Sequence, residues 1–350
     1  MPAAADNLMM ELATVGSRQT AEGAPAPVET AFSIYHEHWW LDVVTDGNWG
    51  EAVITEKGVV VGRMPYVVER KLGLRVSGLP SLVRTLGPVI SPLADETGPR
   101  LLRRVDIATA LINKLPRFEL FDQMFDPRIE DAAMFALQGF SVGHGYTMQL
   151  PQGRTEDEIW EGVTFKTRNH IRKAAKTLEV ATLLEPDEFC RFYNQNLGAK
   201  PNHHGVTRMR RLVDEILARD AGTLMGSRTA DGTLTAAVCI VWDRAAARYL
   251  LATRRVDISG GGATMLLIWE AIRLACRRGI GFDFDGVNSP AMLEFLAAFG
   301  GDLAPRLRVR RASRPYHLAQ AGLTVLRPSR TWGSSRRAPE RTAGPRSPTA

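Results

Sequence analysis

Apolar and polar positions in the first half of the chain switch between the spacing of a helix and the spacing of a strand. Helical spacing is found in three stretches, residues 33–44, 98–115 and 128–140. Strand character is found in four, residues 51–70, 72–80, 118–122 and 141–150. The first of these breaks at Lys57-Gly58, a pair typical of a tight turn. The pattern predicts a helix, a β-meander, and then helix, strand, helix and strand.

The second half repeats that order on a larger scale. Helices are predicted at residues 166–176, 186–197, 207–219, 264–279 and 291–300. Strands are predicted at residues 179–184, 223–229, 233–243, 247–255, 279–286 and 303–312. Helices that flank a mixed sheet make an α+β unit, and here the unit occurs twice. We therefore predict a first lobe over residues 31–152 and a second lobe over residues 153–315.

Both ends of the chain have a different composition. Residues 1–30 lack a long apolar stretch and are expected to be a disordered lead-in. From residue 316 we expect a disordered basic tail, because residues 327–350 are rich in Pro, Ser and Gly and carry six arginines against one acid. The net charge of the whole chain is +6, so the folded part is close to neutral. Any site for anions must therefore be a local patch.

Targeting signals and cysteines indicate the compartment. The lead-in lacks the basic start and apolar stretch of a signal peptide, and no apolar run is long enough to span a membrane. The three cysteines, Cys190, Cys239 and Cys276, are far apart and embedded in apolar segments, which is typical of buried thiols in a reducing compartment. A cytoplasmic protein is expected.

Residues 166–176 form the most concentrated block of positive charge, with five basic side chains and no acid. In the predicted helix Arg168, Arg172 and Lys176 follow one another at i, i+4 spacing, and Lys173 widens the cationic face. Two interpretations stay open: a solvated helix face, or a face that binds phosphate or another anion. Under the second, these four residues would bind the anion.

A glycine-rich turn precedes the helix predicted from Thr264. Gly260, Gly261 and Gly262 would let the backbone approach a phosphate, and a helix N-terminus carries partial positive charge. Asp257 and Ile258 depart from the usual Gln/Arg-x-x-Gly-x-Gly/Ala pattern of an acetyl-CoA loop. A donor-binding loop and a simple flexible turn are both open.

Two acids alternate with two phenylalanines in the strand FDFDG. Asp283 and Asp285 should therefore project from one side of the strand and Phe282 and Phe284 from the other. A carboxylate near a cleft could orient an amine, or deprotonate it if burial raises the pKa of the acid. The alternative is structural work, which is at least as well supported for Asp283. Asp285 stands nearer the carboxyl end of the strand.

The remaining polar candidates are few. His203 lies in a loop between predicted helices and Asn288 follows the acidic strand; with Trp39 they are the candidates for acceptor contacts. His36 and His38 fan out on a helix rather than converge, and no metal site is expected. Motifs of serine hydrolases, zinc enzymes and P-loop NTPases are lacking, and no tightly bound cofactor is expected.

Five stretches in order resemble a known family: HEHWWLDVV, LGPV, WEGVTFKTRNHIRKAAK, LLIWEAIRLACRRGIGFDFDG and FLAAFGG. Together they are similar to the duplicated GNAT acyltransferase fold of the FemAB-like and BioF2-like acetyltransferase family. The resemblance implies that the second lobe is the catalytic one and that its central sheet opens as a V, with the strand at residues 247–255, Arg254 included, along the donor. It also implies that the basic helix lies near the cleft, so that Arg168, Arg172, Lys173 and Lys176 would contact donor phosphates. FemAB-type enzymes have a lysine in the late Phe-Lys-x-x-Phe-Gly box where this chain has Leu296, which weakens a cell-wall role.

Three functions follow from these observations. The first is transfer of an aminoacyl group from aminoacyl-tRNA to a small amine, a hydroxylamine or a peptide. The second is acyl-CoA-dependent N-acetylation of an amino sugar or small amine. The third is a non-catalytic RNA- or polysaccharide-binding protein on a GNAT scaffold. The basic helix and tail favour the first, and the glycine-rich turn favours the second.

Overall fold

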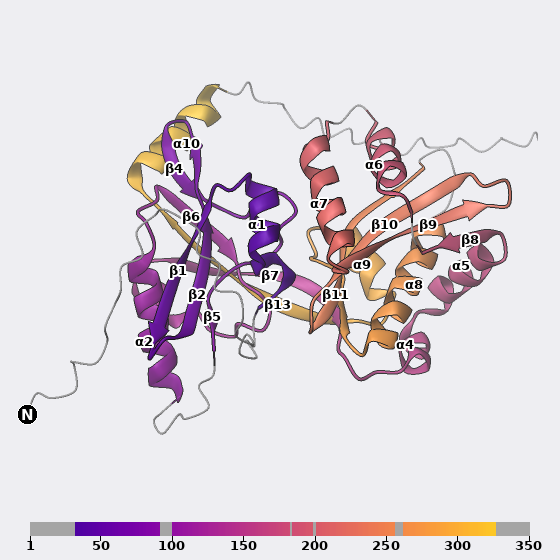
Figure 1. The fold of residues 1–350 in the computed structure, drawn as a ribbon, viewed down its shortest axis with the longest axis horizontal. Helices are drawn as coiled ribbons and strands as arrows, with labels where there is room; N and C mark the ends of the chain where they lie inside the picture. The colour runs from indigo at the N-terminus through magenta and orange to yellow at the C-terminus, as the bar shows by residue number, and fades with distance from the viewer. Residues whose placement is uncertain (1–31, 92–99, 183, 199–200, 256–261, 327–350) are drawn as a thin grey trace, which may run out of the picture.

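The computed structural model describes residues 32–91, 100–182, 184–198, 201–255 and 262–326. Two lobes lie side by side, and the N-terminal one holds β1 to β7 (Figure 1). Its elements are the 3₁₀ helix η1 (Ile34–His36), α1 (His38–Thr45), β1 (Trp49–Glu56), β2 (Val59–Val67), β3 (Glu69–Lys71), β4 (Leu74–Ser77), β5 (Val89–Ile90), α2 (Arg100–Lys114), β6 (Leu120–Met124), α3 (Ala133–Leu137) and β7 (Ser141–Leu150).

The second lobe follows the predicted order closely. It comprises α4 (Glu156–Gly162), α5 (Phe165–Ala175), β8 (Leu178–Ala181), α6 (Pro186–Gln195), α7 (Val206–Ala218), β9 (Gly222–Thr229), β10 (Leu234–Trp242), β11 (Ala246–Arg254), α8 (Gly262–Arg278), β12 (Gly281–Asp283), α9 (Pro290–Ala297), β13 (Asp302–Ala312) and α10 (Arg314–Leu326). Local signals fix several helix starts: Thr155 and Thr164 cap α4 and α5, and Ser289 caps α9 just before a proline.

One sheet runs through both lobes, and this differs from the prediction of two separate sheets. Within the described residues its strand order is β3-β4-β6-β13-β7-β12-β11-β10-β9-β8, while β1, β2 and β5 form a second sheet. Strand β13, predicted as the last strand of the second lobe, pairs with β6 and β7 of the first. Strand β12 in turn pairs with the end of β7. The two lobes share a sheet because the end of β7 pairs with β12 of the second lobe. Strand β13, which follows in the second lobe, can then pair along β7 and enter the sheet of the first lobe.

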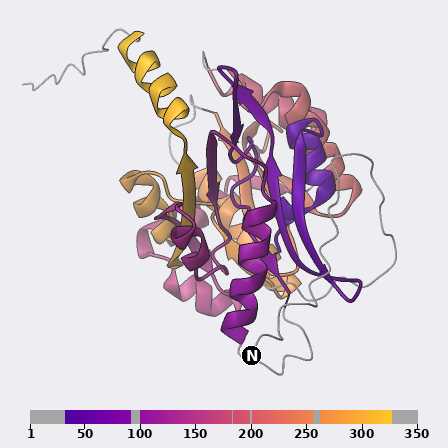
Figure 2. The ribbon, with the colours of Figure 1, turned by 90° about the vertical axis from the view of Figure 1, so that its left-hand side faces the viewer.

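Helix α10 also differs from the prediction. It begins at Arg314 and continues to Leu326, so the first part of the expected basic tail is helical. Figure 2 shows it projecting from the end of β13. Residues 327–350 and the lead-in 1–31 lie outside the described residues.

A shared core joins the lobes. In the second lobe α5 and α8 pack on one face of the sheet, and α6 and α7 pack on the other. Helix α1 of the first lobe packs against α7, and its buried residues Trp40 and Leu41 belong to the same core cluster as Leu212 and Val213. At the rim Asp46 pairs with two arginines of α7. The lobes therefore form a continuous apolar interface rather than a loose contact.

The sheet opens between β11 and β12. These parallel strands pair only from Ala246 to Arg248, and beyond that point β12 no longer accompanies β11. Opposite β10, Leu251 pairs with Cys239 and Tyr249 with Ile240, so Leu250 between them forms a bulge. Among the described strands none pairs with the β12-facing edge of β11 from Tyr249 to Arg254, which leaves backbone groups of that edge available to a ligand.

Gly300 brings two distant motifs into contact. A Cβ atom at this position would lie 2.7 Å from the carbonyl oxygen of Gly162, at the end of α4. The amide of Thr164 also donates to the carbonyl of Ala298 at 3.0 Å. The glycine at position 300 is therefore required, because the two backbones touch there.

Replacing Gly300 by alanine should cost about 3 kcal/mol of unfolding free energy, since left-handed strain adds to the forced separation of the backbones. Gly232 is the matched control, because its φ of 83° is close to the 78° of Gly300 but nothing lies within 4 Å of a Cβ there. Gly232→Ala should cost only about 1 kcal/mol. Equal losses in denaturant unfolding would show that the contact with Gly162 is unimportant.

Candidate active site at the junction of the lobes

Asp285 lies where the first lobe meets the opening between β11 and β12. Its side chain is only 2% exposed. The Tyr35 hydroxyl donates to Oδ1 at 3.1 Å, and Nε of Arg84 donates to Oδ2 at 2.8 Å. Both partners come from the first lobe, Tyr35 from η1 and Arg84 from the loop before β5. The carboxylate at the end of β12 is thus held by groups more than two hundred residues away in the sequence.

Asp283 stabilises the backbone turn that carries Asp285. Its carboxylate accepts hydrogen bonds from Thr147 at 2.5 Å, Gln149 at 2.9 Å and Nη2 of Arg306 at 3.0 Å, and from the amide of Asp285 at 2.8 Å. Burial alone would raise the pKa of Asp283, but the charge of Arg306 and these hydrogen bonds hold it below the ordinary value. Asp283 is therefore an ionised structural group that fixes the turn, and the structural interpretation fits it.

The alternation of FDFDG places the two acids as predicted. Phe282 and Phe284 are buried in the core beneath α8, while Asp283 and Asp285 lie on the face toward the first lobe. Regular strand ends at Asp283, and Asp285 has a φ of 67°. Such a backbone is strained for an aspartate and concentrates at functional sites. Here the amide of Gly286, bonded to Thr147 at 3.0 Å, and the Asp283 carboxylate hold it in place.

The environment of Asp285 suits a group that exchanges protons. Burial raises its pKa, Arg84 and Arg306 lower it, and the nearby charge of Asp283 raises it, with a net value of about 6. A carboxyl group with this pKa is mostly ionised at neutral pH, yet it accepts a proton far more readily than an exposed aspartate.

Arg84 links Asp285 to the bulge in β11. While Nε donates to Asp285, Nη2 donates to the carbonyl of Leu250 at 3.2 Å. The side chain of Arg84 is 31% exposed, in contrast to 5% for Arg306 and for Arg248. Of these three arginines near the acid pair, Arg84 is the one that reaches solvent.

Two further residues of the second lobe lie near Arg84. Tyr193 and His204 feel its charge, and burial raises the pKa of Tyr193. Burial, the adjacent His203 and Arg84 lower the pKa of His204 to about 4, so its imidazole is neutral at pH 7. Its Nδ1 shares a 2.5 Å hydrogen bond with the Ser81 hydroxyl. This bond ties the loop that carries Arg84 to the second lobe.

The second lobe is similar to a known protein family. Residues 166–290 match the family model of the acetyltransferase (GNAT) domain. The chain is an acyltransferase with a GNAT domain. The match spans the basic helix, the splayed strand β11 and the turn that carries Asp285.

Solved structures share the fold across both lobes of this GNAT protein. FemX is 10% identical with a TM-score of 0.59, covering 80% of this chain and 93% of that one. L-PGS from Bacillus licheniformis is 12% identical with a TM-score of 0.50, covering 82% and 91%. A search of curated proteins finds no match. In the part of the chain that the structure describes, no helix is long and apolar enough to cross a membrane and no cluster of potential metal ligands occurs.

The basic helix of the GNAT domain lies beside the start of α8, and two of its basic side chains already have partners within the protein. Helix α5 packs against α8, and a Cβ at Gly262, where α8 begins, would lie 3.5 Å from the carbonyl of His170. Nη1 of Arg168 donates to the carbonyls of Trp160 and Glu161 at 3.0 Å each, and Arg172 stacks over the Trp160 ring. Arg168 thus caps helix α4 rather than extending to a ligand, because its long side chain reaches the end of the preceding helix.

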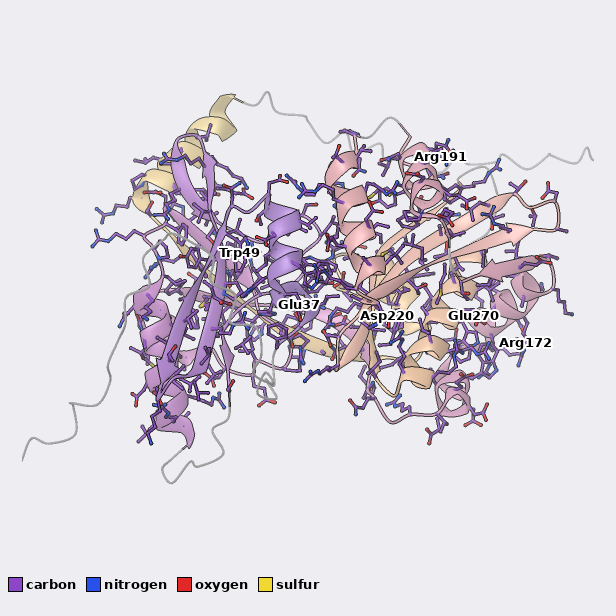
Figure 3. All side chains as sticks on the ribbon, in the orientation of Figure 1. Glu37, Trp49, Arg172, Arg191, Asp220 and Glu270 are labelled. Atoms are coloured by element: carbon purple, nitrogen blue, oxygen red, sulfur yellow. The ribbon has the colours of Figure 1, made fainter. Side chains whose placement is uncertain are left out.

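The other predicted donor contacts remain accessible. Lys173 and Lys176 are exposed on α5, and Arg254 is exposed at the end of β11. Arg172 lies at the end of the second lobe farthest from the first, whereas Glu37 lies at the junction (Figure 3). Strand β11 spans the space between these two regions. Gly260 and Gly261 lie outside the described residues.

The three residues predicted to contact the acceptor do not lie together in the structure. His203 is exposed and stacks on His204 with ring centroids 3.8 Å apart, so it lies close to the Arg84 region. Asn288 is exposed in the turn that follows Asp285. Trp39 instead packs at the lobe interface, where Arg219 lies 5.1 Å from its ring. Trp39 is therefore better explained as part of the interface.

The contribution of the first lobe to this site was not foreseen. Arg84 and Tyr35 are first-lobe residues with no motif of their own, although Arg84 stands just before the LGPV stretch. Leu296, which replaces the family lysine, is 1% exposed in the core beneath the sheet. A lysine there would be buried, whereas Arg84 contacts the Asp285 carboxylate directly.

Proposed function

We propose that this acyltransferase transfers an aminoacyl group from aminoacyl-tRNA to an amine of a small molecule, a hydroxylamine or a peptide, at the junction of the two lobes. The observation that carries the proposal is the Asp285–Arg84–Leu250 arrangement. It puts a carboxyl group with a raised pKa beside the backbone bulge of the splayed strand. In the GNAT architecture that strand accompanies the donor, so the acyl carbon would lie near the bulge.

The reaction is direct attack by the acceptor nitrogen on the acyl carbon. The new C–N bond forms, the ester C–O bond of the donor breaks, and the proton lost by the nitrogen goes to the Asp285 carboxylate. The protonated Asp285 then gives that proton to the departing ribose oxygen, which leaves as a hydroxyl group, and the carboxylate is restored. Asp285 acts as base and orienter, while the free amides of β11 near Leu250 are the candidates for stabilising the developing oxyanion. Tyr35 and Arg84 keep the carboxylate in position.

The spread of positive charge favours a long anionic donor. The exposed lysines Lys166, Lys173 and Lys176 lie on α5 and at its C-cap, and ten residue steps, or about 15 Å along the helix axis, separate the first from the last. A single pyrophosphate would use only part of that length, whereas an RNA backbone places phosphates along it. The arginine-rich residues 327–350 would add attraction that depends on salt.

Acyl-CoA is the second candidate donor. Helix α8 starts at Gly262 close against α5, so its N-terminus and the lysines of α5 could hold one compact group of phosphates. The matched family model describes acetyltransferases, which also favours this donor.

Salt dependence separates the two donors. Changing Lys173 and Lys176 together to glutamine should flatten the log–log salt slope of aminoacyl-tRNA affinity by roughly two units or less and leave acyl-CoA affinity much less changed. Arg168→Gln is the control, because it should lower the melting temperature through loss of the α4 cap instead. The measurement is donor binding against salt for both donors. Unchanged slopes for both would make α5 a merely solvated face.

A further inference from the structure

The acceptor's chemical class can be narrowed from the groups that the junction presents to solvent. Asp285 itself is almost fully enclosed, and the accessible charge beside it is the guanidinium of Arg84. We infer that the acceptor carries a carboxylate within a few atoms of its reacting amine, and that Arg84 binds this carboxylate. The inference rests on the proposed function, because it concerns the acceptor of the same site.

The hydrogen-bonding capacity of Arg84 supports an anionic ligand. A guanidinium has five N–H donors. Nε is used by Asp285 and Nη2 by the carbonyl of Leu250, and Nη1 has no partner among the described residues. The two terminal nitrogens can therefore still present a fork of N–H groups. A carboxylate is the planar group that such a fork binds with two parallel hydrogen bonds.

The charge balance of the buried groups points the same way. Asp283 pairs with Arg306 and Asp285 pairs with Arg84, so two acids already face two arginines. Arg248 is neutralised separately by Asp243 and Asp126. A cationic amine that entered alone would add uncompensated charge to a desolvated site, which is costly. An acceptor with both an ammonium and a carboxylate brings no net charge.

The neighbours of Arg84 do not supply a competing charge. His204 is neutral because its pKa is about 4, and Tyr193 is a phenol with a raised pKa. Both can donate or accept hydrogen bonds beside the carboxylate. The resulting subsite is Arg84 with Tyr193 and His204 around it, next to the proton-accepting Asp285. It fits amino acids and short peptides in which amine and carboxylate are close.

Matched acceptors test this assignment. Full-length protein is supplied with donor and with glycine or glycinamide, and likewise with β-alanine or its amide, at concentrations corrected to equal free amine. Wild-type protein should prefer each acid over its amide by roughly tenfold to a hundredfold in kcat/KM, the effect expected for charge-assisted hydrogen bonds. In Arg84→Gln the ratio should fall close to one, and in Arg84→Lys it should be intermediate because a lysine keeps the charge but not the fork.

The outcomes distinguish the possible errors. A ratio near one in the wild type, or a preference that persists in Arg84→Gln, overturns the inference while acyl transfer stands. An Arg84→Gln variant whose donor KM rises while the ratio is kept assigns Arg84 to the donor phosphates and also overturns it. Absence of transfer to any acceptor from either donor refutes the proposed function itself. Thermal unfolding of each variant shows whether it is folded.

Discussion

Asp285→Asn should lower turnover roughly 10²- to 10⁴-fold, the usual contribution of a positioned general base. The same variant should melt no lower than the wild type at pH 8, and we expect it to melt higher. Burial of the charged carboxylate is the reason, because it raises the pKa of Asp285 to about 6 in the folded protein. The two measurements are a transfer assay and thermal unfolding.

The raised pKa of Asp285 determines whether the Asp285→Asn change stabilises or destabilises the fold. A carboxyl group whose folded pKa exceeds its unfolded value of about 3.9 stabilises the fold at low pH, and this contribution is lost as the pH rises through 6. Above that pH the ionised group costs about 3 kcal/mol relative to a neutral one. Asparagine removes that cost but cannot accept the proton. A large loss of stability in Asp285→Asn would show that the carboxylate is structural.

Arg306→Met should have the largest effect on stability, a loss of about 3–5 kcal/mol, because it leaves the Asp283 carboxylate buried without its counter-charge. Both side chains are almost fully enclosed, at 5% and 2% exposure. Arg308→Met is the matched control, since it removes an arginine two residues along β13 that pairs with Asp122 but whose own side chain is 53% exposed. That change should cost no more than about 1 kcal/mol.

The effect of Arg306→Met should also depend on pH. The folded pKa of Asp283 lies below its unfolded value, so its contribution to stability is present above pH about 4 and is lost as the pH falls through the folded pKa. The difference between wild type and variant in denaturant unfolding should therefore shrink toward acid pH. A small loss that is independent of pH would mean that Asp283 does not rely on Arg306.

The order of helices and strands could be predicted from the sequence because each element carries its own period. The alternation of FDFDG predicted Asp283 and Asp285 on one face, and both do face the first lobe, but the strand ends at Asp283 and a left-handed turn orients Asp285. The pairing of the strands could not be predicted in the same way. Nothing local in β13 says that it returns to lie between β6 and β7, because that choice depends on where distant strands end.

The site itself depends on contacts over long sequence distances. Asp285 could be named as a candidate because it lies at the end of a patterned strand, whereas Arg84 and Tyr35 contact it from a loop and a short helix without a recognisable pattern. The charges of α5 show the converse. Their spacing predicted a cationic face, but only the structure shows that Arg168 is engaged with the end of α4.

The ratio of the transfer rates of wild type and Asp285→Asn across pH tests the central claim most directly. Ionisation of the acceptor amine affects both proteins and cancels in the ratio, so the remaining dependence reports Asp285. We expect a ratio of roughly 10²–10⁴ above pH 7 that falls about tenfold per pH unit below pH 6, as the wild-type carboxylate becomes protonated. A ratio that stays near one, or one that is large but does not change with pH, would contradict a role for Asp285 as the base at the junction of the lobes.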